Sequence, residues 1–260
     1  MELSISTGLY YTKDYEEILD LIAQTDCKNI ELFLNQAFMD VPINKLEKAL
    51  SVRNLEVSII HNPLEFLVFP KGETEDFWLS KSISMAKKLG AKLIVSHMVF
   101  DKVDEERMAI DDIHKQNIEK YSNTEDIFIT TENLPSPEVD TFLRKYDELH
   151  DYLVQQDLPM TFDTTHCAVA NRCIIETYLK FKKHVKNIHL SDFADGAEHK
   201  ILGTGELPIA EFLQTLVQDN YEGLLTLEYD FDNSARNDIK TFDEAAKALV
   251  ESVNFVKRCI

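Results

Sequence analysis

Leu224-Leu225-Thr226-Leu227 is followed directly by Glu228, and Ile127-Phe128-Ile129-Thr130-Thr131 is followed directly by Glu132. Both runs are short, mostly apolar and rich in residues that favour β-structure, and each ends in a carboxylate. Near-continuous apolar runs of this length are typical of parallel strands that helices cover on one side and that pack inward on the other. These two runs decide the fold, because the rest of the chain repeats their pattern.

The repeat accounts for the whole length of the chain. We predict eight strands, at residues 3–7, 29–34, 55–60, 93–96, 127–131, 160–162, 185–190 and 224–227. Longer helical patterns separate them. Asp14 with Glu17 predicts a capping box, and Gly90 and Gly223 stand between helix and strand, where left-handed caps are common. No linker rich in Ser, Gly or Pro divides the chain. We therefore predict an α/β protein, a single (β/α)8 TIM barrel with parallel strands, forming one domain over residues 1–260.

Composition and charge exclude several classes of protein. Hydrophobic residues make up 44% of the 260, yet no run of about 18 apolar residues predicts a membrane span, and the N-terminus does not resemble a signal peptide. The four cysteines form no CxxC pair, which is typical of reduced thiols in a cytoplasmic protein. The formal net charge of −19 disfavours binding of a phosphate backbone and so argues against nucleic acid.

Polar residues gather where the predicted strands end. In such barrels the active site lies at the carboxyl ends of the strands. Windows at these ends cover roughly a tenth of the chain, so about one of eight histidines should fall there by chance. Four do, and they are His61, His97, His166 and His189. His199 follows in the loop after the seventh strand, where we expect a solvated residue if its position is taken alone.

Three carboxylates share this end of the barrel with the histidines. A carboxylate that follows an apolar strand is costly to bury alone, so it needs a cation or a hydrogen-bond partner. A metal ion explains several such groups better than separate salt bridges do. We therefore predict a divalent-metal site formed by Glu132, Asp163, His189 and Glu228. This oxygen-rich set with one imidazole suits Mn2+, Zn2+, Co2+ or Mg2+, and the spacing of the ligands does not choose among them. We expect Mn2+ or Zn2+.

In these motifs the chain resembles the xylose isomerase-like barrel superfamily, which includes sugar isomerases and epimerases and also endonuclease IV. The resemblance spans nearly the whole chain, and it depends on the order of the motifs more than on any one of them. Its carriers are His61-Asn62-Pro63, Thr131-Glu132-Asn133, Phe162-Asp163-Thr164-Thr165-His166, Ile188-His189-Leu190-Ser191-Asp192, residues 199–205 and Leu227-Glu228.

The sugar-processing members give one set of implied roles. In them the positions that match Glu132, Asp163, His189 and Glu228 bind one divalent metal. The positions that match Glu132 and Glu228 also act as acid–base groups, and the one that matches His166 contacts substrate oxygens. Such relatives are often dimers or tetramers, so the resemblance also allows a homo-oligomer. Residues 191–199 lack the Arg that ketose epimerases tend to carry there, which argues against a 3-epimerase in particular.

Endonuclease IV gives a rival set of roles. There the positions that match the four ligands, together with His61, His97, His166 and His199, bind three zinc ions that cleave DNA at abasic sites. Two features argue against this rival. The acidic ligand expected two residues before His199 is Ala197, although Asp192 or Asp195 could substitute, and residues 33–37 lack the Arg expected for DNA.

We therefore expect a metal-dependent isomerase or epimerase whose substrate is a sugar, a sugar phosphate, an inosose or another polyol. A metal polarises a carbonyl and acidifies the neighbouring C–H group, and a carboxylate then transfers the proton. An endonuclease IV-like phosphodiesterase is the first alternative. A lyase, a dehydratase or a non-catalytic metal-binding barrel is the second, because one fold serves many chemistries.

Overall fold

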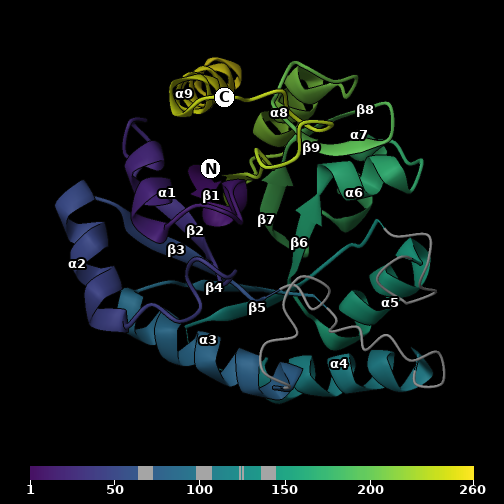
Figure 1. Cartoon of the computed structure of the whole chain (residues 1–260). Helices are drawn as coiled ribbons and strands as arrows, with labels where there is room; N and C mark the ends of the chain where they lie inside the picture. Colours follow the sequence, from purple (N-terminus) through teal and green to yellow (C-terminus); the bar gives the residue numbers. More distant parts are fainter. Residues whose placement is uncertain (64–72, 98–106, 123, 125, 136–144) are drawn as a thin grey trace.

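The computed structural model describes residues 1–63, 73–97, 107–122, 124, 126–135 and 145–260. Its elements follow one another as β1 Glu2–Ser6, η1 Thr7–Leu9, α1 Tyr15–Ile22, β2 Asn29–Phe33, α2 Ile43–Arg53, β3 Glu56–His61, α3 Glu75–Leu89, β4 Leu93–Ser96, α4 Arg107–Tyr121, β5 Phe128–Glu132, α5 Tyr146–Gln156, β6 Met160–Asp163, α6 Thr164–Val169, α7 Ile174–Phe181, β7 Val185–Leu190, β8 Asp192–Ala194, β9 Ala197–Lys200, α8 Ile209–Gln218, β10 Leu224–Leu227 and α9 Phe242–Cys259 (Figure 1).

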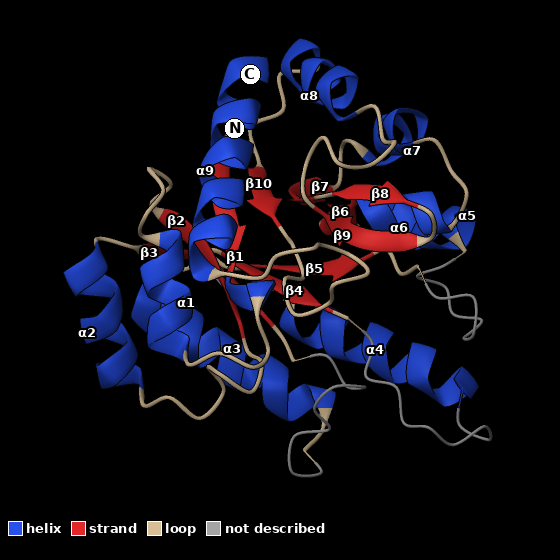
Figure 2. Ribbon diagram, turned by 45° about the horizontal axis from the view of Figure 1, so that its top comes forward, coloured by secondary structure: helices blue, strands red, loops and turns tan. Residues whose placement is uncertain are grey.

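The strands close into a parallel barrel. Its order is β1-β10-β7-β6-β5-β4-β3-β2, and β2 returns to β1 to complete the ring. Helices surround the strands on the outside (Figure 2). The predicted (β/α)8 TIM barrel is therefore confirmed, and each predicted strand end lies within one residue of the observed one. The strands that end in His61, Glu132 and Asp163 extend one residue beyond the predicted ends, so these three polar residues are the last residues of their strands.

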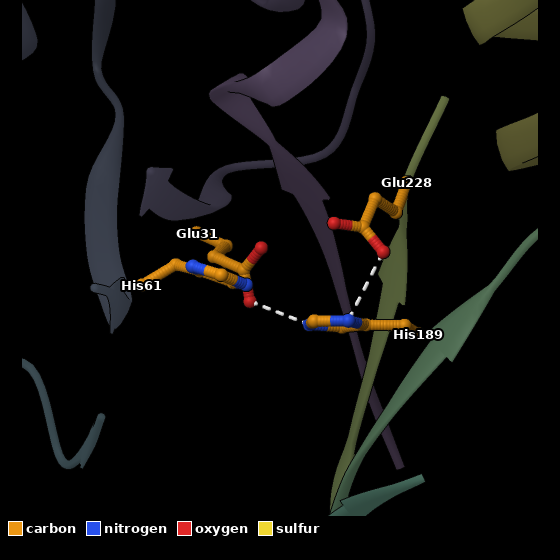
Figure 3. Close-up of side chains that lie close together, drawn as sticks. All are labelled: Glu31, His61, His189 and Glu228. Carbon is orange, nitrogen blue, oxygen red and sulfur yellow. Dashed lines mark hydrogen bonds and ion pairs between the residues drawn. The ribbon is translucent and has the colours of Figure 1, made fainter. Parts of the chain in front are cut away.

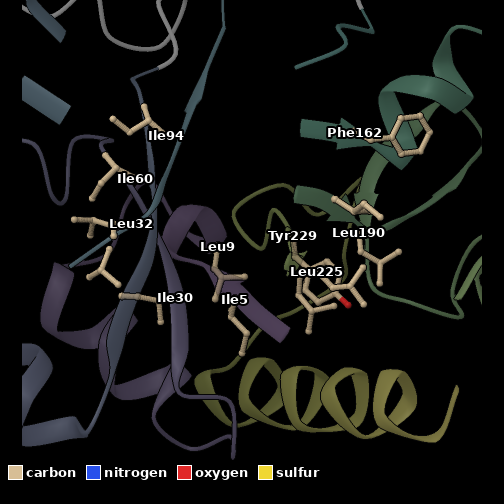
Figure 4. Close-up of a cluster of buried hydrophobic side chains, with 14 of the residues drawn as sticks. Ile5, Leu9, Ile30, Leu32, Ile60, Ile94, Phe162, Leu190, Leu225 and Tyr229 are labelled. Carbon is tan, nitrogen blue, oxygen red and sulfur yellow. The ribbon is translucent and has the colours of Figure 1, made fainter. Parts of the chain in front are cut away.

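The main core lies between the barrel and its helices. Its buried residues include Ile60 and Ile94 on one side of the barrel and Leu190 and Leu225 on the other, and α9 covers the side of the barrel near Ile5 (Figure 4). A second, smaller cluster contains Ile59, Leu93 and Val95. Successive strand residues point to opposite faces of a sheet, so this cluster lies inside the barrel, on the same face as His61.

Local signals at the helix ends are partly confirmed. Asp14 and Glu17 form the predicted capping box of α1. Gly90 caps α3 with a φ of 84°, a left-handed conformation that favours glycine. Gly223 was predicted to be such a cap, and this is wrong. A Cβ atom there would lie 2.2 Å from the Tyr221 hydroxyl and 2.5 Å from the Lys186 carbonyl, so close packing requires this glycine.

Within the described part of the chain, no helix combines the length and the apolar character that crossing a membrane requires.

A core substitution tests this architecture. Leu225 is fully buried between β10 and the outer helices, so Leu225→Ala should lower the free energy of unfolding by about 2–5 kcal/mol. Val217 on α8 is 41% exposed, and Val217→Ala should change it by about 0.5 kcal/mol or less. Urea unfolding followed by circular dichroism measures both. Equal losses in the two variants would contradict the placement of Leu225 in the core.

Candidate metal centre

The four predicted metal ligands lie together at the carboxyl end of the barrel. Glu132 ends β5, Asp163 ends β6, His189 lies in β7 and Glu228 follows β10. Barrel closure sets these strands side by side in the order β10-β7-β6-β5. One ligand atom of each side chain lies within 4.8 Å of the other three. The predicted set is therefore one physical group, and metal binding by it stays a prediction.

The donor atoms of this group converge without hydrogen bonds between them. Nδ1 of His189 lies 3.0 Å from Oε2 of Glu228 and 3.2 Å from Oε1 of Glu132. These three buried atoms and Oδ2 of Asp163 nevertheless have no hydrogen-bond partner within the described part of the chain. Buried polar atoms without partners are costly, and a cation between them would satisfy all four. The residues present therefore fit a divalent metal.

A second compact group of candidate ligand atoms also contains Glu132. His61, His97 and Glu132 also bring one ligand atom each within 4.8 Å of one another. Nε2 of His97 lies 2.8 Å from Oε2 of Glu132 and 3.2 Å from Nε2 of His61. Nδ1 of His61 donates to the carbonyl of Asn62 at 2.7 Å, which leaves Nε2 as the acceptor that faces His97. Two imidazoles and a carboxylate are ligands typical of zinc.

Asn133 holds the ends of β5 and β6 in register. Its Oδ1 accepts from the amide of Asp163 at 2.9 Å, and its Nδ2 donates to the carbonyl of Asp163 at 3.1 Å. Its own carbonyl accepts from Nδ1 of His166 at 2.8 Å. This bond places the proton of a neutral His166 on Nδ1 and leaves Nε2 as the acceptor. Asn133 thus orients both Asp163 and His166.

Burial and charge act on the carboxylates in opposite directions. Burial raises the pKa of Glu132, but His189 and His97 outweigh it and hold that pKa well below its usual range. Burial likewise raises the pKa of Glu228, and His189 brings it down below its usual range. For Asp163 burial prevails and its pKa is raised. Glu132 and Glu228 are therefore ionised at neutral pH.

The histidines show the complementary effect. Burial lowers the pKa of His189, but Glu228 and Glu132 reverse this and raise it well above its usual range. For His166 burial is outweighed by Asp163 and Glu132, which raise the pKa to about 10. Burial dominates at His97, whose pKa is lowered. Without a metal, positive charge on His189 and His166 compensates the two carboxylates.

Sequence reasoning missed Glu31 of β2. Its side chain is fully buried, and its Oε2 lies 2.9 Å from Nε2 of His189 (Figure 3). Glu31 also forms a third compact group of ligand atoms with His61, His189 and Glu228. The available signal was a carboxylate inside the apolar run Asn29-Ile30-Glu31-Leu32-Phe33-Leu34. Glu31 lies within its strand, whereas the other candidate ligands lie at or near strand ends.

His199 does not lie in a solvated loop, so that expectation is wrong. It belongs to β9, which pairs with β8 in a short antiparallel hairpin. Asp195 and Gly196 form its turn with φ values of 53° and 76°. An Asp-Gly pair is a strong signal for a two-residue hairpin, and it was overlooked. The hairpin places Nδ1 of His199 3.7 Å from Oε2 of Glu228, with the His199 side chain only 15% exposed.

Neither of the two acidic residues considered as substitutes near His199 joins the metal-ligating groups. Asp192 uses its carboxylate to accept the backbone amides of Gly203, Gly205 and Leu207 at 2.9–3.0 Å. Asp195 is exposed in the hairpin turn. Among the described residues, the compact groups include neither. His166 and His199 lie with their ring centroids 5.5 Å apart, and both stay predicted as additional ligands.

Comparison with known proteins agrees with this architecture. The family model for the xylose isomerase-like TIM barrel matches residues 13–259, and the chain belongs to that family. It is 25% identical to an uncharacterized protein of Methanocaldococcus jannaschii, with both chains covered in full. The structure is similar to D-psicose 3-epimerase from Clostridium cellulolyticum, solved with D-tagatose, at a TM-score of 0.76 and 14% identity over 100% and 99% of the two chains. It is also similar to 3-keto-D-glucoside 4-epimerase from E. coli, at a TM-score of 0.72 and 14% identity over the whole of both chains.

The raised pKa values predict that metal binding releases protons. A metal-bound imidazole must lose its proton, whereas Glu132 and Glu228 are already ionised because their pKa values are lowered. The affinity for Mn2+ should therefore rise as the pH increases above about 6.5, the usual pKa of histidine. Titration calorimetry in buffers of different ionisation enthalpy measures the proton release directly. An affinity that stayed constant with pH, without proton release, would contradict this charge assignment.

Proposed function

We propose that the chain is a divalent-metal-dependent isomerase or epimerase that moves a proton alpha to a carbonyl of a sugar, a sugar phosphate or an inosose. One observation carries the proposal. Two carboxylates that are ionised at neutral pH, the buried Glu132 and the 15% exposed Glu228, approach Nδ1 of His189 at 3.2 and 3.0 Å. Bases that flank one point are the arrangement that proton removal and return at a single substrate require.

The metal supported by this donor set is Mn2+ or Zn2+, with Co2+ or Mg2+ as alternatives. Glu132, Asp163, His189 and Glu228 would hold it. When bound, it supplies a Lewis acid that polarises a carbonyl and its neighbouring hydroxyl. The similarity to structures of sugar epimerases supports a sugar as the substrate class.

Four free cysteines support a cytoplasmic location.

Residues of the chain transfer the proton and bind the substrate. Glu132 or Glu228 removes the proton, and the same carboxylate or the other one returns it at the adjacent carbon or on the opposite face. Nε2 of His166 is free to bind a substrate oxygen, because Nδ1 is bonded to the carbonyl of Asn133. Glu132 is 1% exposed and the Glu228 side chain 15%, so little water reaches either carboxylate to compete for the transferred proton.

Proton exchange tests the proposal. Metal-loaded protein incubated in deuterium oxide with D-tagatose, D-psicose or an inosose should incorporate deuterium next to the carbonyl. Glu132→Gln and Glu228→Gln should each lower that rate about 10²- to 10⁴-fold. Glu56→Gln, at the exposed start of β3, is the matched control and should leave the rate unchanged. Mass spectrometry measures the exchange, and equal rates in all variants would refute the catalytic roles.

A zinc phosphodiesterase is the second candidate, and the group formed by His61, His97 and Glu132 favours it. Metal analysis and a nicking assay on abasic DNA separate the two functions. We expect one metal per chain and no nicking. About three zinc ions per chain, with nicking of abasic DNA, would overturn the isomerase proposal. The bonds of Asp192 to backbone amides and the net charge of −19 argue against that outcome.

A further inference from the structure

Glu31 is a buried carboxylate that the proposed chemistry does not use. It reaches across the interior of the barrel from β2 to a histidine 158 residues later in the chain. Within the described residues, its carboxylate forms one ion pair, with His189. A buried carboxylate that serves only the fold is expensive, since a packed apolar side chain would cost less. The position of Glu31 therefore calls for a role connected to His189.

The two nitrogens of His189 face different partners. Nε2 lies 2.9 Å from Oε2 of Glu31, on the side away from the metal-ligating group. Nδ1 lies 3.2 Å from Glu132 and 3.0 Å from Glu228, and Figure 3 shows the contact with Glu228. A neutral imidazole carries one proton, so a proton held on Nε2 by Glu31 leaves the lone pair of Nδ1 for a metal.

The ring itself is held in place by packing. The imidazole of His61 stacks on that of His189, with centroids 5.6 Å apart and planes 18° from parallel. Stacking fixes the plane of the His189 ring but does not choose which nitrogen carries the proton. A hydrogen-bond acceptor at Nε2 favours the proton on that nitrogen, and the carboxylate of Glu31 is placed to be that acceptor.

We propose that Glu31 is a positioning residue, which holds His189 in the Nε2–H tautomer with Nδ1 directed at the metal. This role rests on the proposed metal site. A carboxylate that accepts from a ligating imidazole also makes that imidazole a stronger donor, and loss of such a partner typically weakens metal binding by about 10- to 100-fold. The role extends the site from the carboxyl ends of the strands to the interior of β2.

Two substitutions at Glu31 separate a positioning role from direct ligation. Glu31→Ala removes the acceptor, so the dissociation constant for Mn2+ or Zn2+ should rise about 10- to 100-fold. Glu31→Gln keeps an acceptor of nearly the same size, so it should recover most of that affinity, with a loss of about fivefold because a neutral acceptor bonds more weakly. Thr226→Val changes a buried polar residue of β10, the strand next to that of His189, and is the matched control.

The tautomer of His189 distinguishes a positioning role from a merely structural one, because a substitution that only weakened the fold would not change it. In Zn2+-loaded protein labelled with 15N-histidine, the resonances of His189 are assigned by their loss in His189→Gln. Wild type and Glu31→Gln should show a protonated Nε2 and a metal-bound Nδ1. In Glu31→Ala this pattern should be lost or broadened by exchange. Thermal melting of the metal-free variants shows whether each one folds.

Titration calorimetry on chelator-treated protein separates the outcomes. A wild-type chain that bound neither Mn2+ nor Zn2+ would overturn the proposed function, and this role with it. Metal binding by wild type with unchanged affinity in Glu31→Ala would overturn the role of Glu31 alone. Equal losses in Glu31→Ala and Glu31→Gln would show direct ligation, which also contradicts positioning.

Discussion

Both oxygens of Glu132 are buried at the mouth of the barrel, and a carboxylate in that position must be compensated by positive charge. Its neighbours are four imidazoles, two from other strands, one from the residue after β4 and one from α6, at 2.8 Å for His97, 3.1 Å for His166, 3.2 Å for His189 and 3.8 Å for His61. Glu132 thereby belongs to two of the compact groups of ligand atoms. Because the charge of this one carboxylate must be balanced, the surrounding strands need imidazoles at the positions that face it.

The barrel supplies that compensation through its closure. The strands that carry the oxygen-rich group are neighbours in the sheet, whereas Glu31 reaches His189 from β2, with β1 and β10 between their strands. The site therefore exists only in the closed barrel. The outer core between strands and helices holds this closure, and the hydrogen bonds of Asn133 fix the relative height of β5 and β6 at the site.

Much of this arrangement could be predicted from the sequence. Apolar runs of strand length located the eight strands, and the polar residues at their ends identified Glu132, Asp163, His189 and Glu228. Glu31 could not be predicted in the same way. Its pairing to β3 passes through a register shift between Ile30 and Glu31, and no local pattern shows on which face such a residue lies. Its partner is also 158 residues away. The hairpin that holds His199 is different, because its Asp-Gly turn was present in the sequence and was overlooked.

Anomalous diffraction from crystals grown with Mn2+ tests the central claim most directly, since it locates the ion without reference to activity. We expect one strong peak between Glu132, Asp163, His189 and Glu228, with ligand atoms at about 2.2 Å and with Nδ1 of His189 among them. The absence of a peak at the mouth of the barrel, or an Mn2+ ion bound through Nε2 of His189, would contradict the proposed metal site.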